Sequence, residues 1–215
     1  MQIVKVTCKG ETPLLMEPMS DAVLESLRTG KRLPINKDRT AEEVALEKIY
    51  KDENNNPCIP ADNLWSCLVE AGRLVPFKGK KNISTADESL LGGLLRIKEE
   101  FLPLQNGSPI THRVDKRRGR LPDGTAVCLV RPRFDHWGFS ATLVIKDGDI
   151  DEKKMKELFE AAGTFKGIGG HRKKGSFGRF IVTGWDVIGG DKKKAPAKKA
   201  ASDESEGGET ADEES

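Results

Sequence analysis

The sequence has little of the side chains on which metal and redox sites depend. Its 215 residues include four cysteines and three histidines. The cysteines form no C-x-x-C pair and have no histidine at zinc-finger spacing, so neither a metal knuckle nor a disulfide framework is indicated. We expect no cofactor and no metal, and reduced core thiols of the kind found in cytosolic proteins. These thiols are Cys8, Cys58, Cys67 and Cys128.

Long apolar runs are also missing. No segment approaches the length of a membrane span. The first residues, M-Q-I-V-K-V-T-C, alternate like a strand and do not form the apolar core of a signal peptide. We therefore expect a cytoplasmic protein with no membrane partner.

The net charge of +2 hides two unlike regions. Residues 189–215 hold five lysines against eight acidic residues, a charge of −3, which leaves +5 for residues 1–188. The C-terminal region is a basic block followed by an acidic block, without apolar periodicity. Such a segment cannot bury enough apolar surface to offset the entropy lost on ordering, so we expect a disordered tail. Its acidic block is a candidate contact for a protein partner, or a solubilising segment.

The most distinctive stretch is residues 163–180, G-T-F-K-G-I-G-G-H-R-K-K-G-S-F-G-R-F. It has six glycines and five basic residues and no acidic residue. Glycine allows positive φ and lets a ligand approach the main chain, while the cations attract phosphates. The sequence therefore predicts a loop whose backbone lies open to a polyanion.

Two common phosphate loops do not match this stretch. A P-loop needs Lys and then Ser or Thr after its second conserved glycine, but Ser176 directly follows Gly175. A dinucleotide fingerprint opens a helix after a strand, whereas this loop follows a helical pattern and precedes a strand pattern. Nucleotide hydrolysis and hydride transfer lose their main support.

Two further basic segments, residues 78–81 and 113–120, could converge with the loop on one face. Phe134, Trp137 and Phe177 are either base-stacking or core side chains, whereas Trp65 lies on the apolar face of a helix and is read as core. The candidate nucleic-acid-binding residues are Lys166, Gly167, Gly169, Gly170, His171, Arg172, Lys173, Lys174, Gly175 and Arg179 in the loop, with Arg113, Lys116, Arg117, Arg118, Arg120, Arg131 and Arg133 outside it.

Apolar periodicity predicts the main elements. Strands are expected at residues 2–9, in the second half of 90–104, at 126–134 paired with 139–145, and at 177–187 as a central strand. The clearest helices are 61–75 and 151–162, the second with Asp151 at its start and Gly163 at its end, and shorter helices are expected at 21–28, with Ser20 as a cap, and at 40–51, with a Thr40–Glu43 capping box. If one strand belongs to an insertion, the order is βαββαβ, a ferredoxin-like α+β core in residues 1–188 with insertions at about 10–57 and 76–125.

At this point the residues resemble a known family. Gly167-Ile168-Gly169, followed after five residues by Gly175-Ser176-Phe177-Gly178, resembles the signature of the RAMP superfamily, the RNA-binding proteins of CRISPR systems. The helix start I-P-A-D-N-L-W-S-C-L is similar to that of CRISPR backbone subunits. A group of phage and prophage proteins is also similar, through T-P-L-L-M, I-P-A-x-N-L, R-P-R-F-x-x-W, G-I-G-x-x-R and G-R-F.

The resemblance implies a ferredoxin-like fold and single-stranded nucleic acid as ligand, bound side by side by a homo-oligomer. It also implies an alternative, because some superfamily members are metal-independent RNases. For that activity His171 and His112 are the candidate catalytic residues if they meet across a bound strand. We predict a non-catalytic binder of RNA or single-stranded DNA, phage-encoded and acting in the host cytoplasm. The third alternative is a phage structural protein whose basic loops meet an acidic protein surface.

Overall fold

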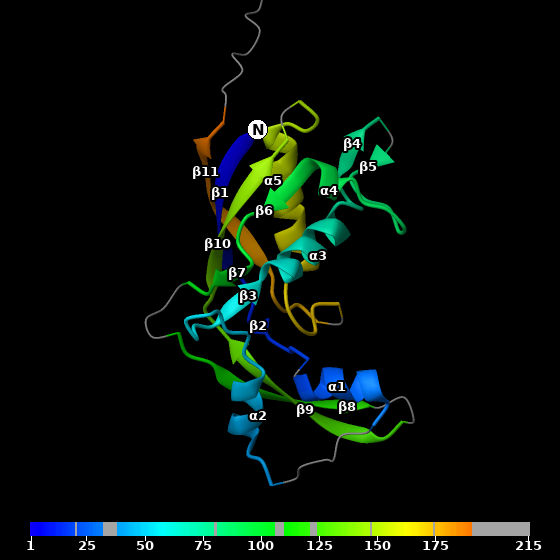
Figure 1. The fold of residues 1–215 in the computed structure, drawn as a ribbon, viewed down its shortest axis with the longest axis vertical. Helices are drawn as coiled ribbons and strands as arrows, with labels where there is room; N and C mark the ends of the chain where they lie inside the picture. Colours follow the sequence, from blue (N-terminus) through cyan, green and yellow to red (C-terminus); the bar gives the residue numbers. More distant parts are fainter. Residues whose placement is uncertain are drawn as a thin grey trace, which may run out of the picture.

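A four-stranded antiparallel sheet forms the centre of the molecule, with the strand order β11-β1-β10-β6 (Figure 1). Its strands are β1 (Gln2–Gly10), β6 (Leu95–Ile97), β10 (Gly138–Ile145) and β11 (Phe180–Gly189). The computed structural model describes residues 1–19, 21–31, 38–79, 81–105, 110–120, 124–146, 148–173 and 175–190. Within these ranges, every helix is too short or too polar to cross a lipid bilayer.

Helices α3 (Ala61–Ala71) and α5 (Glu152–Ala161) complete the central unit and share one buried cluster with the sheet. In chain order these elements run β1, α3, β6, β10, α5, β11. The predicted ferredoxin-like α+β fold is therefore confirmed. Asp151 caps α5 by accepting a hydrogen bond from the Lys154 amide, as expected, but α3 stops at Ala71 and does not continue to residue 75.

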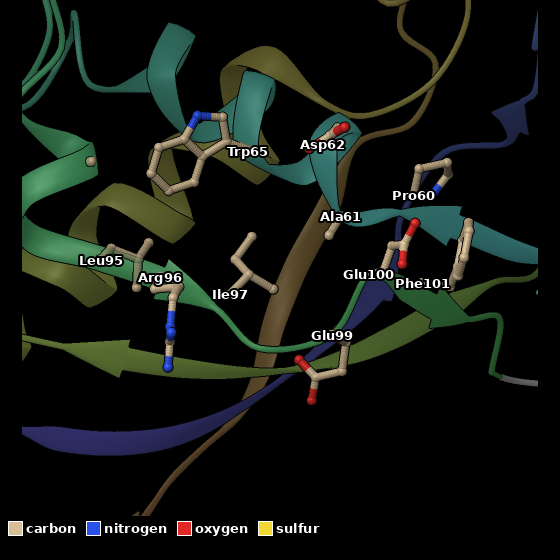
Figure 2. Close-up of a pocket in the computed structure, with 11 residues that line it drawn as sticks. Pro60, Ala61, Asp62, Trp65, Leu95, Arg96, Ile97, Glu99, Glu100 and Phe101 are labelled. Carbon is tan, nitrogen blue, oxygen red and sulfur yellow. The ribbon is translucent and has the colours of Figure 1, made fainter.

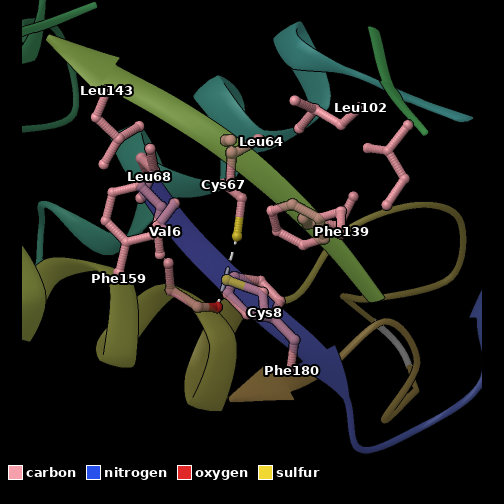
Figure 3. Packing of buried hydrophobic residues seen from close by; sticks show 14 of the residues in the cluster. Val6, Cys8, Leu64, Cys67, Leu68, Leu102, Phe139, Leu143, Phe159 and Phe180 are labelled. Atoms are coloured by element: carbon pink, nitrogen blue, oxygen red, sulfur yellow. Dashed lines mark hydrogen bonds between the residues drawn. The ribbon is translucent and has the colours of Figure 1, made fainter. Parts of the chain in front are cut away.

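The core lies between the sheet and these helices (Figure 3). Cys67 donates a hydrogen bond to the Ala162 carbonyl over 3.5 Å, which ties α3 to the end of α5. Burial raises the pKa of Cys67 to about 12 and that of Cys58 to about 11, so both stay protonated and pack as small apolar groups. Cys8 is also buried, but Cys128 is exposed, so the prediction of a core thiol is wrong there.

A second sheet, in the order β2-β9-β8, lies below the first in Figure 1. Its strands are β2 (Leu14–Leu15), β8 (Arg113–Arg120) and β9 (Ala126–Phe134). The predicted pairing of residues 126–134 with 139–145 is wrong, because β9 pairs with β8 while β10 pairs with β1 and β6. The chain changes sheets at Trp137, which is 1 % exposed and donates its indole N–H to the Thr12 carbonyl.

The remaining elements surround these two sheets. The capping box at Thr40 is present at the start of α2, and Ser20 lies outside the described residues. The elements are α1 (Asp21–Thr29), α2 (Ala41–Glu47), β3 (Cys58–Pro60), β4 (Pro76–Lys78), β5 (Lys81–Asn82), α4 (Leu91–Leu94) and β7 (Phe101–Pro103), with β3 pairing to β7 and β4 to β5.

Strand β11 differs from the central strand expected at residues 177–187. It begins at Phe180 and occupies an edge of the sheet, where Ile181 and Ile188 are exposed. Apolar residues on both faces of this strand therefore did not mean that a neighbouring strand pairs with each of its edges. They are divided here between the core and a solvent-facing surface.

The expected stop of the second helix at Gly163 is also wrong. After α5 the chain continues as a π-helix, η1 (Ala162–Lys166), and turns only at Gly167, where φ is +71°. Gly163 lies inside this element, and a Cβ there would sit 2.0 Å from the Phe180 carbonyl oxygen. The glycine is needed because the start of β11 passes against it.

The first prediction concerns this contact. Gly163→Ala should destabilise the fold by about 2 kcal/mol or more, because a methyl group must displace backbone in the core. The matched control is Gly92→Ala in α4, where no atom lies within 4 Å of the added Cβ and φ is not positive. Urea unfolding of both variants measures the difference. Equal midpoints would show that the Gly163 contact is not a constraint.

Candidate nucleic-acid interface

The glycine-rich loop is held against the protein by its own amides. The amide of Ile168 donates to the Gly178 carbonyl over 2.9 Å, and that of Gly170 donates to the Leu15 carbonyl over 2.7 Å. Further donors are Gly167 to Ala162, Gly175 to His171 and Gly178 to Pro13. The prediction of a backbone open to a polyanion is wrong for these residues, because the N–H groups that would meet phosphate already have partners.

Close packing explains the glycines better. At Gly178, where φ is +67°, an added Cβ would lie 1.8 Å from the Ile168 carbonyl oxygen. Ile168 is fully buried, and Gly169 faces the Leu15 carbonyl. The loop folds back on itself and onto the segment that contains β2, so its glycines position the side chains between them.

Those side chains gather around one pocket of about 380 Å³, which we call the basic pocket. The loop and η1 supply Lys166, Arg172, Lys173 and Arg179. Helix α3 and its C-terminal end supply Glu70 and Arg73, and Phe165 completes the wall. Four of the predicted loop residues are thus brought together, while Lys174 lies outside the described residues.

Two residues of the basic pocket were not predicted from the sequence. Arg73 and Glu70 lie around the end of α3, about 90 residues earlier in the chain than the loop they meet. The sequence offers little indication of a site here, because charged residues beside the apolar stripe of a helix usually belong to its solvent-exposed face. The contact of α3 with η1 brings them to the loop.

The electrostatics of the basic pocket are unbalanced. Glu70 accepts a 2.8 Å hydrogen bond from Arg172 and lies 3.5 Å from the Lys173 ammonium. Burial by itself raises the pKa of Glu70, but Arg172 and then Lys173 outweigh it and hold that pKa below its usual value. One ionised carboxylate thus faces five basic side chains.

Arg179 sharpens this imbalance. Its Nη1 is buried and has no hydrogen-bond partner in the described part of the chain. A buried guanidinium nitrogen without an acceptor costs stability. The basic pocket therefore has the excess of positive charge that an anion site needs.

The hairpin of β8 and β9 supplies a second cationic surface. Lys116, Arg118 and Arg120 alternate along β8, are exposed, and share one face of the strand, about 7 Å apart. Opposite them on β9 lie Cys128 and Val130. We call this surface the hairpin row.

The other face of the hairpin meets the glycine-rich loop. The Arg117 guanidinium lies 4.5 Å from the centre of the Phe177 ring and pairs with Asp115. The same ring lies 5.8 Å from that of His171. The loop and hairpin that the sequence singled out are therefore neighbours, joined through Phe177.

Other predicted binding residues are committed to the protein's own carboxylates. Arg131 is 6 % exposed and donates to Glu17 over 2.7 Å, which identifies it as structural and not as a phosphate contact. Arg133 and Arg113 both pair with Asp135. Lys78 and Lys81 lie in β4 and β5 and do not line the basic pocket.

The candidate aromatic and histidine side chains pack against other parts of the protein. Phe134 and Trp137 are buried, so both belong to the core and cannot stack bases. His112 packs against Phe134 with ring centres 6.1 Å apart, whereas His171 packs against Phe177. In the described ranges no hydrogen bond or ring contact joins the two imidazoles, and no group of three or more His, Cys, Asp or Glu is placed to hold a metal.

A larger cavity of about 630 Å³ has a different character (Figure 2). Trp65 lines it and is only partly buried, so it borders the core instead of lying within it. The cavity is lined by three acidic residues and one basic residue, namely Asp62, Glu99, Glu100 and Arg96. This excess of carboxylates would repel phosphate, so this cavity is a poor nucleic-acid site.

Comparison with known proteins supports the fold. No family model matches the sequence, and no curated protein matches it. Among solved structures, the fold is similar to a chain in the cryo-EM structure of the Type III-B Cmr-β complex bound to cognate target RNA. The TM-score is 0.55 at 14 % identity, over 87 % of this chain and 60 % of that chain. This likeness supports the ferredoxin-like fold, and this chain spans about 60 % of the length of that neighbour.

The second prediction tests the structural role of Arg131. Glu17→Gln removes the charge that faces a buried guanidinium and should cost about 1–3 kcal/mol, at the lower end because Glu17 is partly exposed. Glu25→Gln, which breaks an exposed pair with Arg28, should have no measurable effect. Urea midpoints at pH 7 compare them. If Glu17→Gln leaves the urea midpoint unchanged, Arg131 is not held by this pair and becomes a candidate binding residue again.

Proposed function

We propose that this protein binds single-stranded nucleic acid without cleaving it. The observation that carries the proposal is the basic pocket, where five cations face one carboxylate. Affinity from such contacts comes from phosphates and carries no sequence information. The hairpin row adds three exposed cations on a strand that contacts the same loop through Arg117.

The structural neighbour supports the class of ligand. A similar fold occurs in a Type III-B Cmr-β structure bound to cognate target RNA. By analogy we propose RNA or single-stranded DNA as ligand, a homo-oligomer along the strand, and a tail that contacts a protein partner. The motifs shared with phage and prophage proteins lead us to propose a phage-encoded protein that acts in the host cytoplasm.

The third prediction tests the basic pocket. Arg172→Ala with Lys173→Ala should weaken binding to a single strand about tenfold or more at moderate salt. The slope of log K against log salt should fall by about 1.4, because two phosphate contacts are lost. Lys153→Ala with Lys156→Ala, on the exposed side of α5, removes the same charge and serves as the matched control. Fluorescence anisotropy with labelled RNA and DNA measures both quantities.

Equal affinities for the pocket variant and its control would remove the basic pocket from the interface. The same RNA, incubated with a chelator and resolved on a gel, tests the claim that binding is non-catalytic. Shortened products that disappear in His171→Ala would overturn that claim in favour of a metal-independent RNase.

The fourth prediction uses the exposed thiol of Cys128 to report on the hairpin row. Iodoacetamide should modify this one of the four cysteines rapidly, because the other three are buried. A saturating single strand should slow the reaction several-fold by covering the face shared with Arg118. The reagent is neutral, so a bound polyanion does not repel it from the thiol. Unchanged rates at saturation would place the hairpin row outside the interface.

A further inference from the structure

Phe165 is the most exposed aromatic side chain of the protein, at 62 % of its surface. A single exposed phenylalanine is ordinary. This one, however, lines the basic pocket and directly precedes Lys166, so a flat apolar ring stands beside a set of cations. The other aromatic rings near the loop are already engaged, since Phe177 lies against Arg117 and His171.

The backbone holds Phe165 in place from both ends. The π-helix that carries it contains Gly163 packed under the Phe180 carbonyl. It ends where the Gly167 amide donates to the Ala162 carbonyl over 2.8 Å. Single π-turns are frequent at functional sites, and this one presents the ring outward on a fixed element instead of a free loop.

The wall composition fits a ligand with an anionic part and a flat apolar part. Arg172 and Lys173 share Glu70, while Lys166 and Arg179 have no carboxylate partner in the described ranges. Phosphate oxygens are the acceptors that such guanidinium and ammonium groups bind best. The volume of about 380 Å³ lies in the lower part of the range of small-molecule sites, which suits one nucleotide and not a folded partner.

We propose that Phe165 and the basic pocket form a subsite for one nucleotide unit, with its base on the Phe165 ring and its phosphate among Lys166, Arg172 and Arg179. This inference rests on the proposed function and adds the unit bound. The ring offers no hydrogen bond to a base edge, so the subsite accepts any base. The stacking contribution is independent of salt, unlike the phosphate contacts.

The test compares a base-bearing oligonucleotide with an abasic one of equal length and charge. Phe165→Ala should weaken binding of the base-bearing strand about 5- to 100-fold with an unchanged salt slope, and should leave the abasic strand unaffected. Phe165→Leu, which keeps apolar bulk without a flat ring, should retain only part of the affinity. Ile188→Ala removes another exposed apolar side chain and should change neither affinity.

Two results separate this inference from the function on which it rests. If Phe165→Ala weakens both strands equally, or neither, while the Arg172 and Lys173 variant still loses affinity, the subsite is wrong and the nucleic-acid interface stands. If the wild-type protein binds neither strand, the proposed function itself fails. The exposed position of Phe165 keeps the variants folded, which unfolding midpoints verify.

Discussion

The contact of backbone on backbone between the glycine-rich loop and the start of β11 is the constraint on which the candidate interface depends. Gly163 lies under the Phe180 carbonyl and Gly178 under the Ile168 carbonyl, at separations that no side chain would allow. These approaches fix η1 on one side and residues 167–173 and 175–178 on the other. That packing positions Lys166, Arg172, Lys173 and Arg179 around the end of α3.

A loop anchored in this way presents its cations at little entropic cost. Long basic side chains on a free loop must be ordered when a strand binds, and each ordered side chain costs free energy. Here Arg172 is already held by Glu70, so its guanidinium is aimed before a ligand arrives. The same carboxylate opposes binding, because a phosphate must share or displace it. The pocket thus exchanges part of its affinity for a fixed geometry.

The sequence predicted the elements of the central unit because apolar periodicity and capping are local signals. The alternation of Val4, Val6 and Cys8 and the Asp151 cap are examples. It could not show that residues 126–134 leave the central sheet, since pairing partners are set by which strands meet, and Trp137 alone marks the change of sheet. The fate of Arg131 depended likewise on a carboxylate 114 residues away.

The role of the glycines is a second case in which the sequence does not show which segments of the chain meet. A run of glycines with cations is consistent with two opposite arrangements, one in which the amides meet a ligand and one in which they meet the protein itself. Composition cannot distinguish them, because both need positive φ and an absent Cβ. The amides of Ile168, Gly170 and Gly178 follow the second arrangement, so these amides are not available to a ligand.

The charged side chains of the surface fall into two groups, those paired with carboxylates and those in excess of them. The buried guanidinium of Arg131 pairs with Glu17 and joins two distant segments of the chain, whereas Arg133 pairs with Asp135 two residues along. Where cations outnumber carboxylates, in the basic pocket and along the hairpin row, the field extends to solvent. The cavity beside Trp65 carries the opposite sign. This distribution of charge favours the approach of a polyanion to the glycine-rich loop over its approach to the cavity beside Trp65.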